Sequence, residues 1–159
     1  MRALFIGRFQ PVHEGHRWAI EKILGEDDTL AIVIGSAQES GTKENPFSSA
    51  ERKKMLRSIL PKGANIRLFE VPDIPDDDSY ADHVRNKVGD FDVVWSGNKR
   101  VQDIFFQAGF QIKELPKYKH IHATEIRKRL RTHRDVSGLV PAAVIEIIKN
   151  AGTKKEISQ

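Results

Sequence analysis

The sequence contains no cysteine, so disulfide bonds and thiolate chemistry are both excluded. It has no run of 18 apolar residues, so we expect no helix that crosses a membrane. Its first apolar stretch, residues 3–6, is too short for a secretory signal peptide and runs directly into a glycine. These absences predict a cytoplasmic protein that does not contact a membrane.

A large excess of one charge is also missing, because 26 basic residues face 22 acidic ones and the net charge is +4. Basic residues are concentrated only between positions 117 and 134. They are Lys117, Lys119, Arg127, Lys128, Arg129, Arg131 and Arg134. Such a cluster can bind nucleic acid, the phosphates of a nucleotide, or water alone. No aromatic residue beyond Tyr118 is interleaved with it, so we predict no nucleic-acid partner.

The 159 residues, 39% hydrophobic and 30% charged, are typical of one globular domain. Short apolar runs predict strands at 3–6, 29–34, 66–71, 91–95 and 110–115. Helices are expected at 16–24, 48–60, 80–88, 101–108, 124–133 and 142–150. This alternation predicts an α/β fold with a doubly wound parallel sheet and C-terminal helices. We expect the domain to span 1–152, with a polar tail at 153–159.

Two helix starts carry specific capping signals. Ser48 and Glu51 have the spacing of a capping box, in which each side chain accepts the other residue's backbone N–H. Thr124 is expected to cap the basic helix that follows it. Between the third strand and the next helix lies an acidic loop, Asp73 to Asp78, for which a solvated turn is favoured over a metal site.

The turn after the first expected strand reads Gly-Arg-Phe-Gln-Pro-Val-His-Glu-Gly-His. Where a strand turns into a helix, backbone N–H groups and the helix dipole attract phosphate. Gly7 and Gly15 permit close approach of the backbone. His13 and His16 lie three residues apart and can point to one side of the first helical turn. Arg8 adds a permanent charge and a planar fork for phosphate oxygens.

The residues of this turn argue against several competing functions. Its glycine spacing is neither that of a P-loop nor that of a dinucleotide-binding turn. Zinc binding by His13 and His16 is disfavoured, because there is no cysteine and no zincin spacing. A nucleotide sensor without catalysis would be expected to lose one histidine, and both are present. The turn therefore predicts a phosphate-binding site, with no metal held by protein side chains.

The same turn resembles the G-x-F-x-P-x-H-x-G-H pattern of the nucleotidylyltransferase superfamily at every defined position. The chain is further similar to archaeal-type nicotinamide-mononucleotide adenylyltransferases in several blocks. They are Ile34-Gly35-Ser36-Ala37-Gln38, Asn45-Pro46-Phe47, Glu51-Arg52, Ser96-Gly97-Asn98 and Thr124-Glu125-Ile126-Arg127. The resemblance implies a Rossmann-like domain, assembly into homo-oligomers, and transfer of the adenylyl group of ATP to nicotinamide mononucleotide. NAD and pyrophosphate would be formed by direct in-line attack, with Mg²⁺ carried by ATP.

The resemblance also implies roles for individual residues. Those with an expected catalytic role are Arg8, His13, His16 and Arg127. Those expected to bind ATP are Gly7, Arg8, Phe9, His13, Gly15, His16, Asn98, Thr124 and Arg127. Those expected on the acceptor side are Gln38, Asp73, Ile74, Tyr80 and Asn98, with Ile74 and Tyr80 as a stacking wall for the nicotinamide ring.

The sequence differs from the family pattern at three places. Tyr80 replaces a common tryptophan, His122-Ala123 replaces a Ser-Gly pair, and Glu44 stands where arginine is frequent, beside Lys43. These differences leave open a sister enzyme that uses another acceptor, such as phosphopantetheine, a flavin phosphate or a polyol phosphate, or that uses CTP. Nicotinamide and nicotinic acid mononucleotide are not distinguished either, nor is the oligomer size.

Overall fold

The computed structural model describes the backbone of residues 1–158 and the side chains of residues 1–152. Five strands form one parallel sheet in the order β3-β2-β1-β4-β5. They are β1 (Arg2–Gly7), β2 (Thr29–Ile34), β3 (Ile66–Glu70), β4 (Val93–Ser96) and β5 (Gln111–Glu114). The strand order reverses direction between β1 and β4, so the predicted doubly wound parallel sheet is confirmed.

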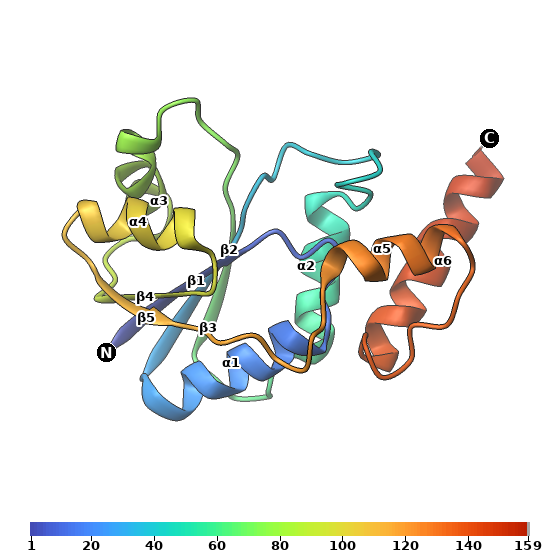
Figure 1. Ribbon diagram of the computed structural model, residues 1–159, viewed down its shortest axis with the longest axis horizontal. Helices are drawn as coiled ribbons and strands as arrows, with labels where there is room; N and C mark the ends of the chain where they lie inside the picture. Colours follow the sequence, from blue (N-terminus) through green and yellow to red (C-terminus); the bar gives the residue numbers. More distant parts are fainter. Residues whose placement is uncertain (159) are drawn as a thin grey trace.

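Helices cover both faces of this sheet. They are α1 (Glu14–Glu26), α2 (Ser49–Ile59), α3 (Tyr80–Val88), α4 (Lys99–Gln107), α5 (Ala123–Arg131) and α6 (Ala142–Ser158). One buried cluster joins α1, α2, α5 and α6 to the sheet, and a second joins α3 and α4 to its other side. Figure 1 shows α3 and α4 at one end of the molecule and α5 and α6 beside α2 at the other. Each helix that the structure describes is too short or too polar to cross a membrane.

The start of α2 follows from local side-chain chemistry at the predicted position. The Ser48 hydroxyl accepts from the Glu51 N–H at 3.1 Å, and the Glu51 carboxylate accepts from the Ser48 N–H at 2.9 Å. This confirms the predicted capping box at the start of α2. The strand at Thr29–Ile34 and the helix at Tyr80–Val88 have the predicted bounds.

The ends of several elements lie one or two residues from the predicted positions, and three further details differ from the sequence-based expectation. Thr124 does not cap α5, because the helix begins one residue earlier and His122, in an extended conformation, is the cap residue. Part of the acidic loop forms a short 3-10 turn, η1 (Asp77–Ser79). Helix α6 continues past Gly152 to Ser158. The side chains of 153–159 lie outside the described residues, so the division into a domain and a polar tail stays a prediction.

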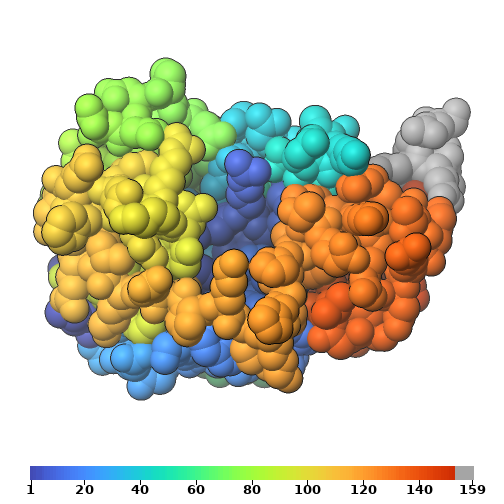
Figure 2. Space-filling view, viewed as in Figure 1, coloured from blue at the N-terminus to red at the C-terminus, as the bar shows by residue number. Residues whose placement is uncertain are grey.

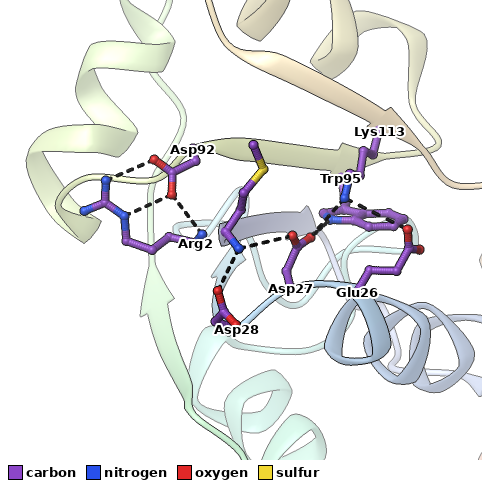
Figure 3. A network of polar contacts seen from close by, with 8 residues as sticks. Arg2, Glu26, Asp27, Asp28, Asp92, Trp95 and Lys113 are labelled. Atoms are coloured by element: carbon purple, nitrogen blue, oxygen red, sulfur yellow. Dashed lines mark hydrogen bonds and ion pairs between the residues drawn. The ribbon is translucent and has the colours of Figure 1, made fainter.

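A buried carboxylate ties the helical layer to the sheet. Asp27, which directly follows α1, accepts a hydrogen bond from the indole Nε1 of Trp95 at 2.7 Å. The Lys113 ammonium lies 3.6 Å from the same oxygen and 4.9 Å from the Trp95 ring, and the N-terminal amine lies 3.7 Å from the other oxygen (Figure 3). The buried charge of Asp27 is therefore compensated by two cations and a neutral donor.

Candidate active site

The carboxyl ends of four strands open into one cavity of about 460 Å³. The loops that follow β1, β2, β3 and β4 all contribute to its walls, as expected for a site at the reversal point of a doubly wound sheet. In Figure 2 the dark-blue segment that follows β1 reaches the surface in a hollow between the yellow α4 region and the orange α5 region. The fold thus brings loops from distant parts of the sequence to one place.

Several residues predicted for the site line this cavity. They are Gly7, Arg8, Asp73, Ile74, Tyr80 and Asn98. Gln38 does not line it, but holds Asp73 in place: the Gln38 amide donates to the Asp73 carboxylate at 2.9 Å and accepts from the Asp73 N–H at 3.0 Å. The Ser36 hydroxyl donates to the same carboxylate at 2.9 Å. A positioned carboxylate therefore lines the cavity.

Tyr80 serves both the cavity and the core. Its ring meets the buried Phe105 ring edge-on at 6.2 Å, and it lines the cavity together with Ile74. Burial raises the pKa of the Tyr80 hydroxyl, and repulsion by the Asp73 carboxylate raises it further. Tyr80 is thus a neutral aromatic wall that is anchored from behind by Phe105.

His13 and His16 cap α1 as a pair. The Nδ1 of His13 accepts from the Gly15 N–H, and the Nδ1 of His16 accepts from the His13 N–H, each at 3.0 Å. The two rings stack with their centroids 3.7 Å apart. Because Nδ1 accepts in both rings, the neutral imidazoles carry their proton on Nε2. The helix start therefore fixes two stacked imidazoles, each with its donor on Nε2.

Both histidines are held in the neutral form. Burial lowers the pKa of His13 to about 4, and repulsion from His122 contributes to this shift. Burial also lowers the pKa of His16 well below its usual value, with a further contribution from His13. At neutral pH the pair therefore offers hydrogen-bond donors without added charge.

The two glycines of the turn make room for aromatic rings. A Cβ on Gly7 would lie 2.8 Å from the Phe9 ring, and a Cβ on Gly15 would lie 2.8 Å from the His13 ring. Phe9 is 1% exposed, and its ring lies 4.7 Å from that of His16. Its side chain therefore supports His16 from the core, and Phe9 does not line the cavity.

Arg127 reaches the turn from α5. Its guanidinium donates to the Gln10 carbonyl at 2.9 Å and to the Thr124 hydroxyl at 3.3 Å. Burial lowers the pKa of Arg127, as do the positive charges of Arg8 and Arg131, while Glu44 opposes them. The structure thus brings Arg127 and Thr124 to the first turn, although neither lines the main cavity.

Some cavity residues carry no motif that would have assigned them from the sequence. Arg100 and Asp77 line the cavity and form an ion pair at 2.6 Å that joins α4 to the acidic loop. Position is the one signal that Arg100 and Asp77 offer, because each lies in or just beyond a loop that follows a strand. Ser36, which belongs to the block at 34–38 but has no role predicted from the sequence, also lines the cavity and holds Asp73. Among the described residues, no group of three or more His, Cys, Asp or Glu side chains is placed to hold a metal ion.

The fold and this site together define a nucleotidyltransferase-type α/β protein, in which a strand-to-helix turn presents donors to phosphate. The chain belongs to the cytidylyltransferase-like family, whose model matches residues 4–129. Proteins named nicotinamide-nucleotide adenylyltransferase are similar over most of its length. That of Thermococcus sibiricus is 41% identical over 155 residues, which cover 94% of this chain and 83% of the relative. That of Archaeoglobus fulgidus is 39% identical over 158 residues, covering 94% and 91%.

Solved structures share the fold at lower sequence identity. The bifunctional NMN adenylyltransferase/ADP ribose pyrophosphatase of Francisella tularensis, complexed with AMP and a manganese ion, matches with a TM-score of 0.71 and 21% identity. The match covers 98% of this chain and 54% of that chain, so this chain spans about half of the longer protein. The NadR protein in complex with NAD and AMP-PNP matches with a TM-score of 0.61 and 19% identity, covering 83% and 43%.

Proposed function

We propose that this chain transfers the adenylyl group of ATP to nicotinamide mononucleotide, forming NAD and pyrophosphate. A phosphate oxygen of the mononucleotide attacks the α-phosphorus of ATP in line, and the bond to the β-phosphate oxygen breaks. The attacking phosphate is already ionised at neutral pH, so the protein has little proton transfer to perform. Its task is to position two polyanions and to stabilise the charge of the transition state.

The paired histidines carry this proposal. Their Nε2–H groups are fixed by Nδ1 contacts to the backbone, and their neutral form persists well below physiological pH. Fixed neutral donors bind the oxygens of a pentacoordinate phosphorus without reorganising during the reaction. In this assignment His13 and His16 donate to the phosphate oxygens around the reacting centre.

Arg8 and Arg127 supply the permanent charge. Arg8 lines the cavity from the turn, and Arg127 reaches the same turn from α5. Their mutual repulsion, which lowers the pKa of Arg127, is relieved when an anion lies between them. We assign them to the triphosphate, with Thr124 and the first turn of α5 beside the β- and γ-phosphates.

The cavity of about 460 Å³ is assigned to the mononucleotide. Tyr80 and Ile74 form an apolar wall suited to a flat ring, and Asp73 and Asn98 supply polar groups close to it. The Asp73 carboxylate repels an acidic ring substituent, which favours the amide over the acid form of the mononucleotide. Arg100 lies opposite, but its ion pair with Asp77 compensates its charge.

The divalent cation enters as part of the ATP substrate. The Francisella relative binds AMP with manganese, and we infer Mg²⁺ for this chain. When bound, the cation neutralises charge on the phosphates. A homo-oligomer and a cytoplasmic location also remain proposals, and light scattering on the purified chain tests the first.

One assay tests the function. The protein is incubated with ATP, Mg²⁺ and a panel of acceptors: nicotinamide and nicotinic acid mononucleotides, phosphopantetheine, a flavin phosphate and a polyol phosphate. CTP is substituted for ATP in a parallel set. Nicotinamide mononucleotide with ATP should release pyrophosphate fastest. A clear preference for phosphopantetheine or a flavin phosphate would contradict the proposal that nicotinamide mononucleotide is the acceptor, but it would still support nucleotidyl transfer as the reaction.

A further inference from the structure

Arg52 is the fully buried arginine of α2, with 0% of its surface exposed. All three nitrogens of its guanidinium donate to backbone carbonyls. Nε donates to Ser48 at 3.2 Å, Nη1 to Arg8 at 3.0 Å and to Gly35 at 2.8 Å, and Nη2 to Ser36 and to Glu39, both at 3.2 Å. These five bonds use every donor that a guanidinium has.

The five carbonyls come from three separate segments. Ser48 caps the helix that carries Arg52 itself. Arg8 lies in the turn between β1 and α1, residues 8–13, which is the catalytic turn of the proposed function, while Gly35, Ser36 and Glu39 lie in the loop after β2. The two loops are also joined by the Gly35 N–H, which donates to the Gly7 carbonyl at 2.8 Å. One buried guanidinium therefore fixes both loops at the mouth of the cavity.

The segments held in this way have unusual backbone conformations. Phe9 and Ser36 both have positive φ angles, 55° and 48°, in the left-handed region that non-glycine residues rarely adopt. Phe9 directly follows the Arg8 carbonyl that Arg52 binds, and Ser36 offers its own carbonyl. Contacts from the surroundings must stabilise such conformations, and Arg52 supplies one hydrogen bond to the turn after β1 and three to the loop after β2.

Arg52 is not explained as half of an ion pair. Within the part of the chain that the structure describes, no carboxylate lies within 4.0 Å of its guanidinium. A buried cation that binds only carbonyls is costly, and an apolar residue would fill an inward position of α2 at lower cost. An apolar residue, however, has no donors and cannot bind the backbone carbonyls of two loops, as the planar guanidinium does.

We propose that Arg52 is a positioning residue for adenylyl transfer: it holds the catalytic turn against the loop at 35–39, and so aims Arg8 at the reacting phosphates. This inference rests on the proposed function for its kinetic test. Arg52 does not touch the substrates and acts through Arg8. Its loss should therefore affect the transition state more than the binding of either nucleotide.

The test compares Arg52→Lys with Arg57→Lys, the same change at an exposed position of the same helix. Lysine keeps the charge but loses the planar fork. Arg52→Lys should lower kcat about 10- to 100-fold, with a smaller change in KM for ATP and for the mononucleotide. Arg57→Lys should match the wild type in both. A wild-type kcat in folded Arg52→Lys would overturn the proposal.

A double-mutant cycle with Arg8→Ala separates positioning from a general structural role. If Arg52 acts through Arg8, Arg52→Lys should lower kcat less than about 2-fold in the Arg8→Ala background. A loss equal to that in the wild-type background would overturn the proposal. The Tm of each variant is measured by thermal unfolding, and the kinetics are compared at a temperature below every Tm, so that only folded protein is compared.

Amide hydrogen exchange tests the clamp without any assay of activity, and so separates its failure from that of the proposed function. The N–H groups of Gly35, Ala37 and Glu39 bond to backbone carbonyls. In Arg52→Lys they should exchange at least about 10-fold faster, while those in the middle of β2 keep wild-type rates. Unchanged loop exchange would overturn the clamp, even if adenylyl transfer is confirmed. If Arg52→Lys does not fold, Arg52→Gln, which keeps an amide donor, takes its place in all three measurements.

Discussion

His13 and His16 owe their tautomer to the start of α1. Each Nδ1 accepts a backbone N–H, so two donors at the helix start, the N–H groups of His13 and Gly15, orient the imidazoles. Stacking on one another and on Phe9 then restricts both rings. The chemistry of the site at the level of single residues is therefore the chemistry of a helix cap.

Replacing either histidine should lower turnover. His13→Ala and His16→Ala each remove a fixed donor to the transition state, so kcat should fall about 10²- to 10³-fold with a smaller change in KM. Steady-state kinetics with ATP and nicotinamide mononucleotide measure this. His133→Ala, at an exposed position beyond α5, is the control. Wild-type kcat in both active-site variants would reduce the histidines to caps.

The low pKa of His13 also predicts how stability depends on pH. The unfolded chain binds a proton at this residue below about pH 6.5, whereas the folded protein excludes it down to about 4. The unfolding free energy should therefore fall as the pH is lowered through this window, with a contribution from His13 of up to about 3 kcal/mol. Urea unfolding from pH 7 to 4 tests this. The unfolding free energy of His13→Asn should fall less over the same pH range than that of the wild type. An equal fall in both proteins would show that the low pKa of His13 does not cause the pH dependence.

Glu44 is an exposed carboxylate whose charge acts on Arg127 and opposes the lowering of its pKa. Removing the negative charge should leave the triphosphate region more positive. Glu44→Gln is therefore expected to lower KM for ATP by about 2- to 5-fold and to leave kcat nearly unchanged. Kinetics at low and at high salt test this, because screening should shrink the difference. An increase in KM would show that Glu44 supports the site.

At the scale of elements, α5 gives its cations different environments. Arg127 bonds to the catalytic turn, whereas Arg129 bonds to Glu125 and to the Asp135 carbonyl, both outside the site. Arg127→Ala should therefore lower kcat/KM for ATP by about 10- to 200-fold, as expected for a lost charge-assisted contact. Arg129→Ala should change it little. The same assay on both variants measures the difference.

The alternative, that α5 binds nucleic acid, is tested by measuring the affinity of both variants for a single-stranded oligonucleotide at several salt concentrations. If the basic segment served nucleic acid, both changes would weaken binding similarly and lower its salt dependence by about one unit each. Unchanged ATP kinetics with lost oligonucleotide affinity would contradict the phosphate clamp.

Apolar runs and capping signals are sufficient to predict the elements. Buried runs such as Thr29–Ile34 can only be interior strands, and the reciprocal contacts of Ser48 and Glu51 are local. Thr124 is predicted as a cap because threonine is common at that position before a helix. The prediction is wrong, since the helix already begins at Ala123 and His122 is the cap residue. Local sequence does not report a cap whose position is decided by tertiary contacts, such as that of Arg127 with Gln10.

The candidate site can be predicted only where a motif carries it. The turn with its two histidines is evident in the sequence, and its first residues, Gly7 and Arg8, line the cavity together with Tyr80 and Ile74, whereas His13 and His16 do not line it. Arg52 belongs to the Glu51-Arg52 block of the family resemblance but has no role predicted from the sequence, and Arg100 looks like an ordinary helical residue. Their positions depend on which loops converge across 44 residues in one case and 23 in the other.

At the scale of the whole molecule, the cavity lies at the carboxyl ends of the strands, between the two hydrophobic clusters that pack on opposite faces of the sheet. Ile6 and Tyr80 pack with the cluster under α3 and α4, whereas Phe9, beneath the catalytic turn, belongs to the cluster under α1, α2, α5 and α6. A nucleotide in this position contacts loops anchored in both cores. Binding should therefore stabilise the domain as one cooperative unit rather than only the loops around the site.

Calorimetry on the chain with and without nucleotide tests this coupling. ATP with Mg²⁺, or NAD, at about 100 times its Kd should add about 2.7 kcal/mol to the unfolding free energy. For a domain of this size, that corresponds to a Tm increase of roughly 5–10 °C within a single transition. Arg127→Ala, measured at the same nucleotide concentration, should reduce the increase because its Kd is higher. An oligonucleotide at equal phosphate concentration should cause little shift, since Arg8 lines a cavity and His13 and His16 are held at a helix cap, not along an open basic face. Two separate transitions, only one of them shifted by nucleotide, would show that the halves unfold independently and that the site belongs to one of them.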